Sequence, residues 1–88
     1  MNASEVKDLR KRTAERFGKG VQCGFGDHFD RLEGSLESAE RKLADSMVSE
    51  SRKEMSQRRY DAAQACIVEI ELASTEAAVY AAFEKANL

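Results

Sequence analysis

The sequence predicts an all-α protein, and three observations lead to this expectation. Of its 88 residues, 44 are Ala, Glu, Lys, Leu or Arg, which is the composition of long helices and coiled coils. The chain contains no proline, and apolar residues recur at helical spacing over most of its length. We expect one helical domain over residues 1–88, with a short helix, a glycine-rich loop and a long antiparallel helical hairpin.

The short N-terminal helix is predicted over about residues 3–17. Asn2 and Glu5 have the spacing of a capping box, in which two side chains satisfy free backbone N–H groups at a helix start. Gly18 follows the last apolar position, as a glycine just beyond a helix commonly does. The predicted apolar face of this helix consists of Val6, Leu9, Thr13 and Phe17.

A glycine-rich loop is predicted over residues 18–26, which hold four of the five glycines. Each glycine costs a helix about 1 kcal/mol relative to alanine, so this segment does not continue the helix. Val21 and Phe25 are its apolar side chains, and they either pin the first helix to the hairpin or form a recognition loop. Asp27 is the expected N-cap of the next helix.

The hairpin is predicted as helices over about residues 28–48 and 52–86. An apolar seam with coiled-coil spacing predicts the first of them, and its members are Phe29, Leu32, Leu36, Ala39, Leu43 and Met47. The seam fails near residue 50, where Ser51 and Glu54 have the spacing of a new capping box. The alternative is one continuous helix from about 28 to 86, which could persist only in an oligomeric coiled coil.

The predicted last helix is apolar on two nearly opposite sides, so both sides need cover. The residues of one side are Ala63, Cys66, Ile67, Ile70, Ala73, Ala77, Tyr80 and Ala81, and those of the other are Ala65, Val68, Leu72, Val79, Ala82 and Phe83. We expect this helix to form a partner-binding surface or a dimer interface. Its predicted anchors are Val68, Leu72, Val79 and Phe83, supported by Ile67, Ile70 and Tyr80.

A homodimer is expected, because the material for a core is scarce. Leu, Ile, Val and Phe total 17 of the 88 residues. A chain of this length buries only about 60–65% of its unfolded surface, which leaves a small margin of stability. A dimeric bundle or coiled coil would supply the missing contacts.

No catalytic, cofactor or metal site is expected. His28 is the only histidine, and its neighbours Cys23, Asp27 and Asp30 lack the paired ligand spacing of zinc sites. Catalysis needs a nucleophile, a base and an orienting group around a pocket, and a helical hairpin offers none. Cys66 lies on an apolar side of its helix and is interpreted as a core residue.

The first helix is rich in cations, which include Arg10, Lys11 and Arg12. Nucleic-acid binders usually carry a strongly basic face, but the whole chain has a net charge of −2 and a pI of about 5.4. A dimeric nucleic-acid-associated regulator that uses these three residues is therefore the alternative to the leading hypothesis.

The leading hypothesis is a non-enzymatic interaction protein. It would act as an adaptor, inhibitor or anti-activator that masks a surface of a larger protein. A second alternative is an oligomeric structural or assembly protein. No stretch approaches the roughly 20 apolar residues that cross a bilayer, so a cytoplasmic protein is expected.

Overall fold

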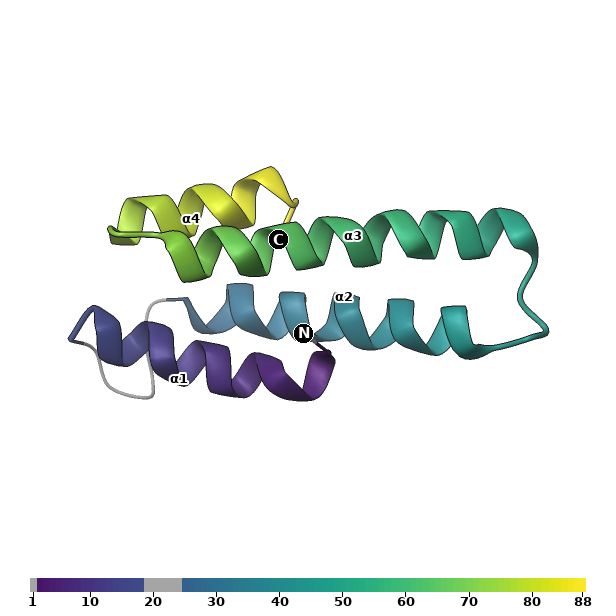
Figure 1. Cartoon of the computed structure of the whole chain (residues 1–88), viewed down its shortest axis with the longest axis horizontal. Helices are drawn as coiled ribbons and strands as arrows, with labels where there is room; N and C mark the ends of the chain where they lie inside the picture. The colour runs from purple at the N-terminus through teal and green to yellow at the C-terminus, as the bar shows by residue number, and fades with distance from the viewer. Residues whose placement is uncertain (1, 19–24) are drawn as a thin grey trace.

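The computed structural model describes residues 2–18 and 25–88, and in these ranges every regular element is a helix (Figure 1). The all-α prediction is confirmed. The elements are a single 3-10 turn, η1 (Ala3–Glu5), followed by α1 (Val6–Arg16), α2 (Gly26–Ala44), α3 (Glu50–Leu72) and α4 (Glu76–Lys85). Val21 and the larger part of the predicted glycine loop lie outside the described residues.

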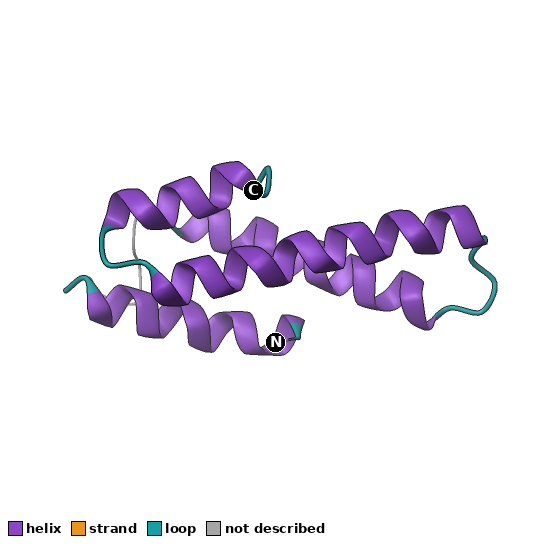
Figure 2. Ribbon diagram, turned by 45° about the horizontal axis from the view of Figure 1, so that its top comes forward, coloured by secondary structure: helices purple, strands orange, loops and turns teal. Residues whose placement is uncertain are grey.

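The two long helices, α2 and α3, lie side by side and antiparallel along the longest dimension of the molecule, which measures 45 × 21 × 18 Å (Figure 1). The short helices α1 and α4 flank this pair within the same half of its length (Figures 1 and 2). We call this half the bundle end. In the other half α2 and α3 run on alone through residues 41–59, and we call this part the arm.

The core lies in the bundle end, and all four helices contribute to it. Phe83 of α4 packs edge-to-face on Phe29 of α2, with ring centroids 5.1 Å apart. Phe25 packs in the same way on Phe29 at 6.5 Å. The largest side chains of the core are Phe25, Phe29, Phe83, Leu9, Leu32, Leu36, Ile70, Val6 and Val79, all of them fully buried.

The first helical segment forms as its sequence predicts. The carboxylate of Glu5 accepts a hydrogen bond from the backbone N–H of Asn2 at 3.2 Å. Thr13 is fully buried, which it tolerates because its hydroxyl donates to the carbonyl oxygen of Leu9 at 2.7 Å. Gly18 ends the segment with a φ of +72°, the left-handed conformation that glycine adopts without steric cost.

The start of α2 differs from the prediction. The helix begins at Gly26, so Asp27 lies in the first turn and Phe25, anchored in the core, takes the N-cap position. A Cβ at position 26 would lie 2.9 Å from the Nη2 atom of Arg10. Glycine at this position therefore leaves space for the guanidinium group. Arg10 also pairs with Asp30, with 3.4 Å between Nη1 and Oδ1. This contact ties α1 to the first turns of α2.

A turn between Ala44 and Glu50 joins α2 to α3, so the chain forms a hairpin and not the alternative continuous helix. The carboxylate of Asp45 accepts from the backbone N–H of Met47 at 2.9 Å. Ser49, and not the predicted Ser51, caps α3, because its hydroxyl accepts from the N–H of Arg52. The turn begins before Met47, which therefore leaves the predicted seam and is 89% exposed.

The segment predicted as one helix over about 52–86 is two helices, with a break at residues 73–75. Thr75 starts α4, because its hydroxyl oxygen accepts from the backbone N–H of Ala78 at 3.1 Å. Arg16 of α1 satisfies the free end of α3, since its guanidinium donates to the carbonyl oxygens of Ile70 and Glu71, each at 2.7 Å. Side chains therefore stabilise a break at which the sequence has neither proline nor glycine.

Burial explains why the chain breaks here. A continuous helix would carry Val79 and Phe83 past the end of the core, whereas α4 folds back and buries both completely. Burial of such a side chain is worth about 1.5–3 kcal/mol, more than the cost of interrupting a helix that is capped on both sides of the break. The α4 part of this predicted apolar side, which consists of Val79, Ala82 and Phe83, is thus covered by the chain itself.

Candidate functional site

The outer face of α3 changes from charged to apolar along its length. Near the arm it carries Glu54 and Arg58, which form an ion pair with 3.2 Å between carboxylate and guanidinium. Towards the break the same face carries Ala65, Val68 and Leu72, which fall within about 60° of the helix circumference. Val68 is 52% exposed and Leu72 is 79% exposed. We call these three residues the apolar stripe.

The predicted interface residues separate into two groups in the structure. Val68 and Leu72 are exposed, whereas four other predicted interface residues, all with aliphatic or phenyl side chains, lie in the core. Those four are Ile67, Ile70, Val79 and Phe83, and each is at most 2% exposed. This corrects the sequence interpretation of Val79 and Phe83 as anchors for a partner, because the reversal of the chain at residues 73–75 turns them inward.

Tyr80 and the predicted loop residue Phe25 belong to an aromatic cluster at the start of α2. Their ring centroids lie 4.6 Å apart. The imidazole of His28 stacks on Phe83 at 4.9 Å, and its Nδ1 atom lies 2.9 Å from the carbonyl oxygen of Leu88. Phe25 is fully buried and thus part of the core, while Tyr80 remains 39% exposed.

Cys66 lies buried between α3 and α4 as a free thiol. Burial, aided by the negative charge of Glu69, raises the pKa of this thiol to about 11. A thiol with such a pKa is almost wholly protonated at neutral pH and is a poor nucleophile. The position is one of core packing, as the sequence predicts.

Two of the basic residues of α1 form ion pairs with carboxylates. Arg10 pairs with Asp30, and Arg12 pairs with both Asp8 and Glu71, with 2.9 and 3.4 Å between the charged atoms. The hydrogen bond to Asp8 raises the pKa of the Arg12 guanidinium. Of the three cations proposed for nucleic-acid contact, Arg10 and Arg12 are thus partly neutralised within the chain, while Lys11 is exposed.

A groove between α2 and α3 opens where α4 ends, and sequence reasoning did not find it. Its first part has a volume of about 600 Å³ and is lined by Ser35, Arg58, Arg59, Ala62, Ala86, Asn87 and Leu88. Its second part has a volume of about 160 Å³ and is lined by Lys42, Arg52, Met55, Ser56 and Arg59. Because Arg59 lines both parts, they are neighbours along α2 and α3, between the end of α4 and the arm. We call the two parts together the basic groove.

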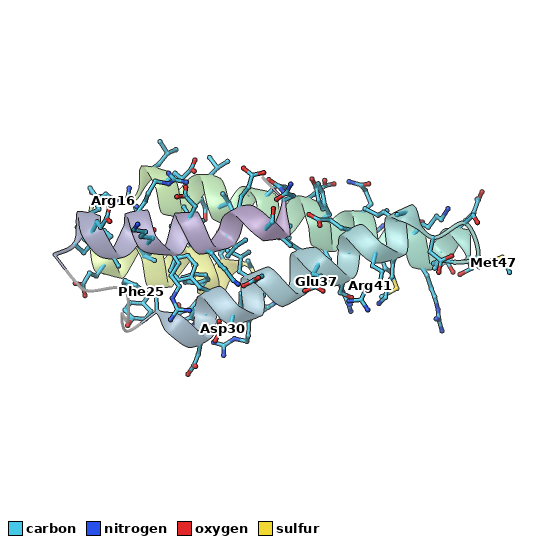
Figure 3. All side chains as sticks on the ribbon, turned by 90° about the horizontal axis from the view of Figure 1, so that it is seen from below. Arg16, Phe25, Asp30, Glu37, Arg41 and Met47 are labelled. Atoms are coloured by element: carbon cyan, nitrogen blue, oxygen red, sulfur yellow. The ribbon has the colours of Figure 1, made fainter. Side chains whose placement is uncertain are left out.

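Figure 3 shows labelled residues of α2 and of the turn that follows it. Glu37 and Arg41 lie on α2 on the way to the hairpin turn, and Met47 lies at the turn itself (Figure 3). Arg41 pairs with Glu37 at 3.7 Å and lines neither part of the basic groove. The arm therefore carries distinct charged surfaces on different sides.

Within residues 2–18 and 25–88, no three side chains of His, Cys, Asp or Glu lie close enough together to hold a metal ion. None of the described helices has both the length and the apolar character needed to cross a bilayer.

Comparison of the chain with protein-family models, with curated proteins and with solved structures finds no match.

Proposed function

We propose that this protein is a non-enzymatic interaction module that binds a larger protein partner and masks part of that partner's surface. The observation that carries the proposal is the apolar stripe on α3. Val68 and Leu72 remain exposed although the core beneath them is closed by residues on the other side of the same helix.

The stripe is suited to helix-mediated recognition. Two large aliphatic side chains one helical turn apart, beside the small Ala65, form the kind of ridge that enters an apolar groove of a partner. Full burial of each large side chain would contribute about 1.5–3 kcal/mol. A small number of such anchors supplies most of the binding energy in known interfaces.

The use of the other chemistry-bearing side chains favours binding over catalysis. The imidazole of His28 packs on an aromatic ring, and the thiol of Cys66 is buried with its pKa raised to about 11. Neither lines the basic groove. Masking of a partner needs only a surface of defined shape, which a rigid helix provides.

The test is affinity capture from the source cell with wild-type protein and with the variant Val68→Glu/Leu72→Lys. This variant removes both anchors, keeps the net charge and adds a favourable pair at i and i+4. The matched control is Glu37→Arg/Arg41→Glu, which reverses an exposed ion pair of α2 that lines neither part of the basic groove.

We expect the wild type and the control to retain the same partner and the anchor variant to bind it at least about tenfold more weakly. Circular dichroism should show equal helicity for the three proteins. Capture by the anchor variant at wild-type strength would refute the proposal. Sedimentation at several concentrations tests whether the stripe forms a homodimer interface instead. If it does, the isolated anchor variant should have a lower mass than the isolated wild type.

A further inference from the structure

The residues that line the basic groove are of two kinds, cationic and apolar. Lys42 of α2 and Arg52 and Arg59 of α3 line its second part, and no acidic residue lines either part. Ala62, Ala86 and Leu88 contribute apolar surface to the first part, and Met55, which is 57% exposed, contributes to the second. A ligand in this groove would meet both positive charge and hydrophobic contact.

Three of these cations are not neutralised by the rest of the described chain. Lys42, Arg52 and Arg59 form no ion pair with another described residue, whereas Arg58 pairs with Glu54. Like charges that gather around one concave surface repel one another unless an anion lies between them. Their arrangement favours an acidic ligand.

The opposite side of the hairpin has the opposite charge. Glu33, Glu37 and Glu40 are spaced by four and three residues and therefore share one side of α2. Glu40 accepts from the backbone N–H of Ala3 at 3.0 Å, which fixes this acidic side next to η1 and α1. The basic groove lies on the α4 side, so positive charge is concentrated there although the chain as a whole is acidic.

The groove continues a path that already holds a helix. In the bundle end α4 packs against α3 and, through Phe83, against His28 and Phe29 of α2. The residues that follow α4 form one end of the groove. The space beside α2 and α3 therefore accepts a helix in the bundle end, and the arm lacks one.

We infer that the basic groove binds an acidic amphipathic helix of a partner protein. Such a helix would lie beside α2 and α3 beyond the end of α4. Its carboxylates would pair with Lys42, Arg52 and Arg59, and its apolar residues would contact Met55 and Ala62. This surface is distinct from the apolar stripe, so the inference does not depend on the proposed function.

The apolar residues that line the groove favour a protein helix over a nucleic acid. A nucleic-acid backbone is bound mainly through its phosphates, and apolar surface such as Met55 and Ala62 adds little to such binding.

The test uses a synthetic helical peptide of about 14 residues, or about four turns, with leucine on one face and glutamate on the flanks. Its binding to the full chain is measured by fluorescence anisotropy. The groove variant is Arg52→Glu/Arg59→Glu. The control is Lys7→Glu/Lys11→Glu, which changes the net charge equally on exposed positions of α1. A second peptide has lysine in place of every glutamate.

We expect the groove variant to bind the acidic peptide at least tenfold more weakly and the control to lose less than twofold. The lysine peptide should bind the groove variant better than it binds the wild type. In NMR titrations the backbone amides of Ser35, Ser56 and Ala62 should shift, and those of Val68 and Leu72 should not.

Four results would overturn the inference. The first is absence of binding of the acidic peptide to the wild type, and the second is an equal loss in both variants, which would indicate unspecific attraction. The third is tighter binding of an oligonucleotide or of inorganic phosphate through the same arginines. Amide shifts confined to Val68 and Leu72 would instead assign the peptide to the apolar stripe, which overturns the inference but leaves the proposed function intact.

Discussion

The bundle end and the arm are built from the same two long helices, yet they differ in what surrounds these helices. In the bundle end α1 and α4 cover both sides of the pair, and every large fully buried side chain lies there. In the arm, residues 41–59, Ser56 alone is fully buried, while Leu43 and Val48 are only partly covered. The number of flanking helices, and not the sequence of α2 and α3 alone, decides where the core is.

This difference separates stability from recognition within one small chain. The bundle end buries apolar surface and supplies most of the free energy of folding. The arm leaves Met47 and Met55 accessible, together with Lys42, Arg52 and Arg59, which form no ion pair with another described residue. A surface that does not contribute to the core is available for binding, so we expect substitutions in the two regions to have different consequences.

The largest expected difference is between alanine substitutions at Phe83 and at Met55. Phe83 is fully buried against Phe29 and His28, so Phe83→Ala should lower the free energy of unfolding by about 3–5 kcal/mol. Met55 is 57% exposed in the arm, and Met55→Ala should change the free energy of unfolding by less than about 0.5 kcal/mol. Urea denaturation followed by circular dichroism measures both.

Because the stability of a chain of this size is itself only about 5–15 kcal/mol, Phe83→Ala could leave too little folded protein to measure. Phe83→Leu then serves as the milder change, with an expected loss of about 1–1.5 kcal/mol. Equal effects at positions 83 and 55 would show that the arm is part of the same core and would remove the distinction between the two regions.

A second, smaller difference should appear in the reactivity of thiols placed in the two regions of α3. In a Cys23→Ser background the thiol of Cys66 reports on the bundle end. In a Cys23→Ser/Ser51→Cys/Cys66→Ser protein the thiol at position 51, which is exposed in α3, reports on the arm. Burial raises the pKa of Cys66 to about 11, so at pH 8 its thiolate should be about 100-fold rarer than that of a thiol whose pKa is 9.0. We expect the thiol at position 51 to react with a disulfide reagent at least tenfold faster.

The raised pKa of Cys66 also makes the free energy of unfolding depend on pH in a defined direction. The folded protein keeps the Cys66 proton to a higher pH than the unfolded chain does, so the stabilising effect of the protonated thiol is lost as the pH rises from 9 to about 11. Reaction of Cys66 as fast as that of a free thiol at pH 8 would contradict the burial of this side chain.

The smallest expected effect concerns α2, the helix that both regions share. Gly34 lies within this helix, and a Cβ there meets no atom within 4 Å. Gly34→Ala should therefore stabilise the protein by about 0.5–1 kcal/mol through the restricted unfolded chain and the better helix propensity.

Gly18→Ala is the matched comparison. It should destabilise the protein by about 1 kcal/mol, because the φ of +72° at this position is strained for alanine. Thermal unfolding of both variants checks the opposite signs. A loss of stability in Gly34→Ala would mean that this face of α2 is covered in solution.

Several local features could be predicted from the sequence because they depend on neighbouring residues. The spacing of Asn2 and Glu5, the glycine at position 18 and the apolar seam through Leu32 and Leu36 each describe interactions within one or two helical turns. The corresponding elements form close to the predicted boundaries. The seam failed only beyond Ala39, where the flanking helices end and Leu43 is only partly covered.

The break at residues 73–75 could not be predicted in the same way. The two apolar sides of such a helix can be covered either by a second chain or by a break that lets the helix fold back on itself. The local helix propensity of the sequence is the same in both cases. The choice depends on Arg16, whose guanidinium binds the end of α3 from a position 54 residues away from Ile70. Thr75 followed by Glu76 was the available local signal, since a threonine at the cap and an acidic first turn are typical of a helix start.

The candidate site was predicted in part for the same reason. Val68 and Leu72 remained exposed, but assignment of Val79 and Phe83 to the core required knowledge of the break. The basic groove depends on where α4 stops along α2 and α3, which is a property of the assembled fold. The basic pair at Arg58 and Arg59 was visible in the sequence, but Lys42 joins Arg59 only through the hairpin.

The contact between Arg16 and the end of α3 has a consequence for the order in which the molecule folds. It joins residues 54 and 55 positions apart, and the bond between Ala3 and Glu40 spans 37 positions. The turn that closes the arm, by contrast, joins helices separated by five residues. Because local contacts form faster than distant ones, the hairpin turn can close while the bundle end is still open. The arm, which contributes the smaller share of the final stability, is thus the region able to form first. It holds α2 and α3 together while α1 and α4 pack against them.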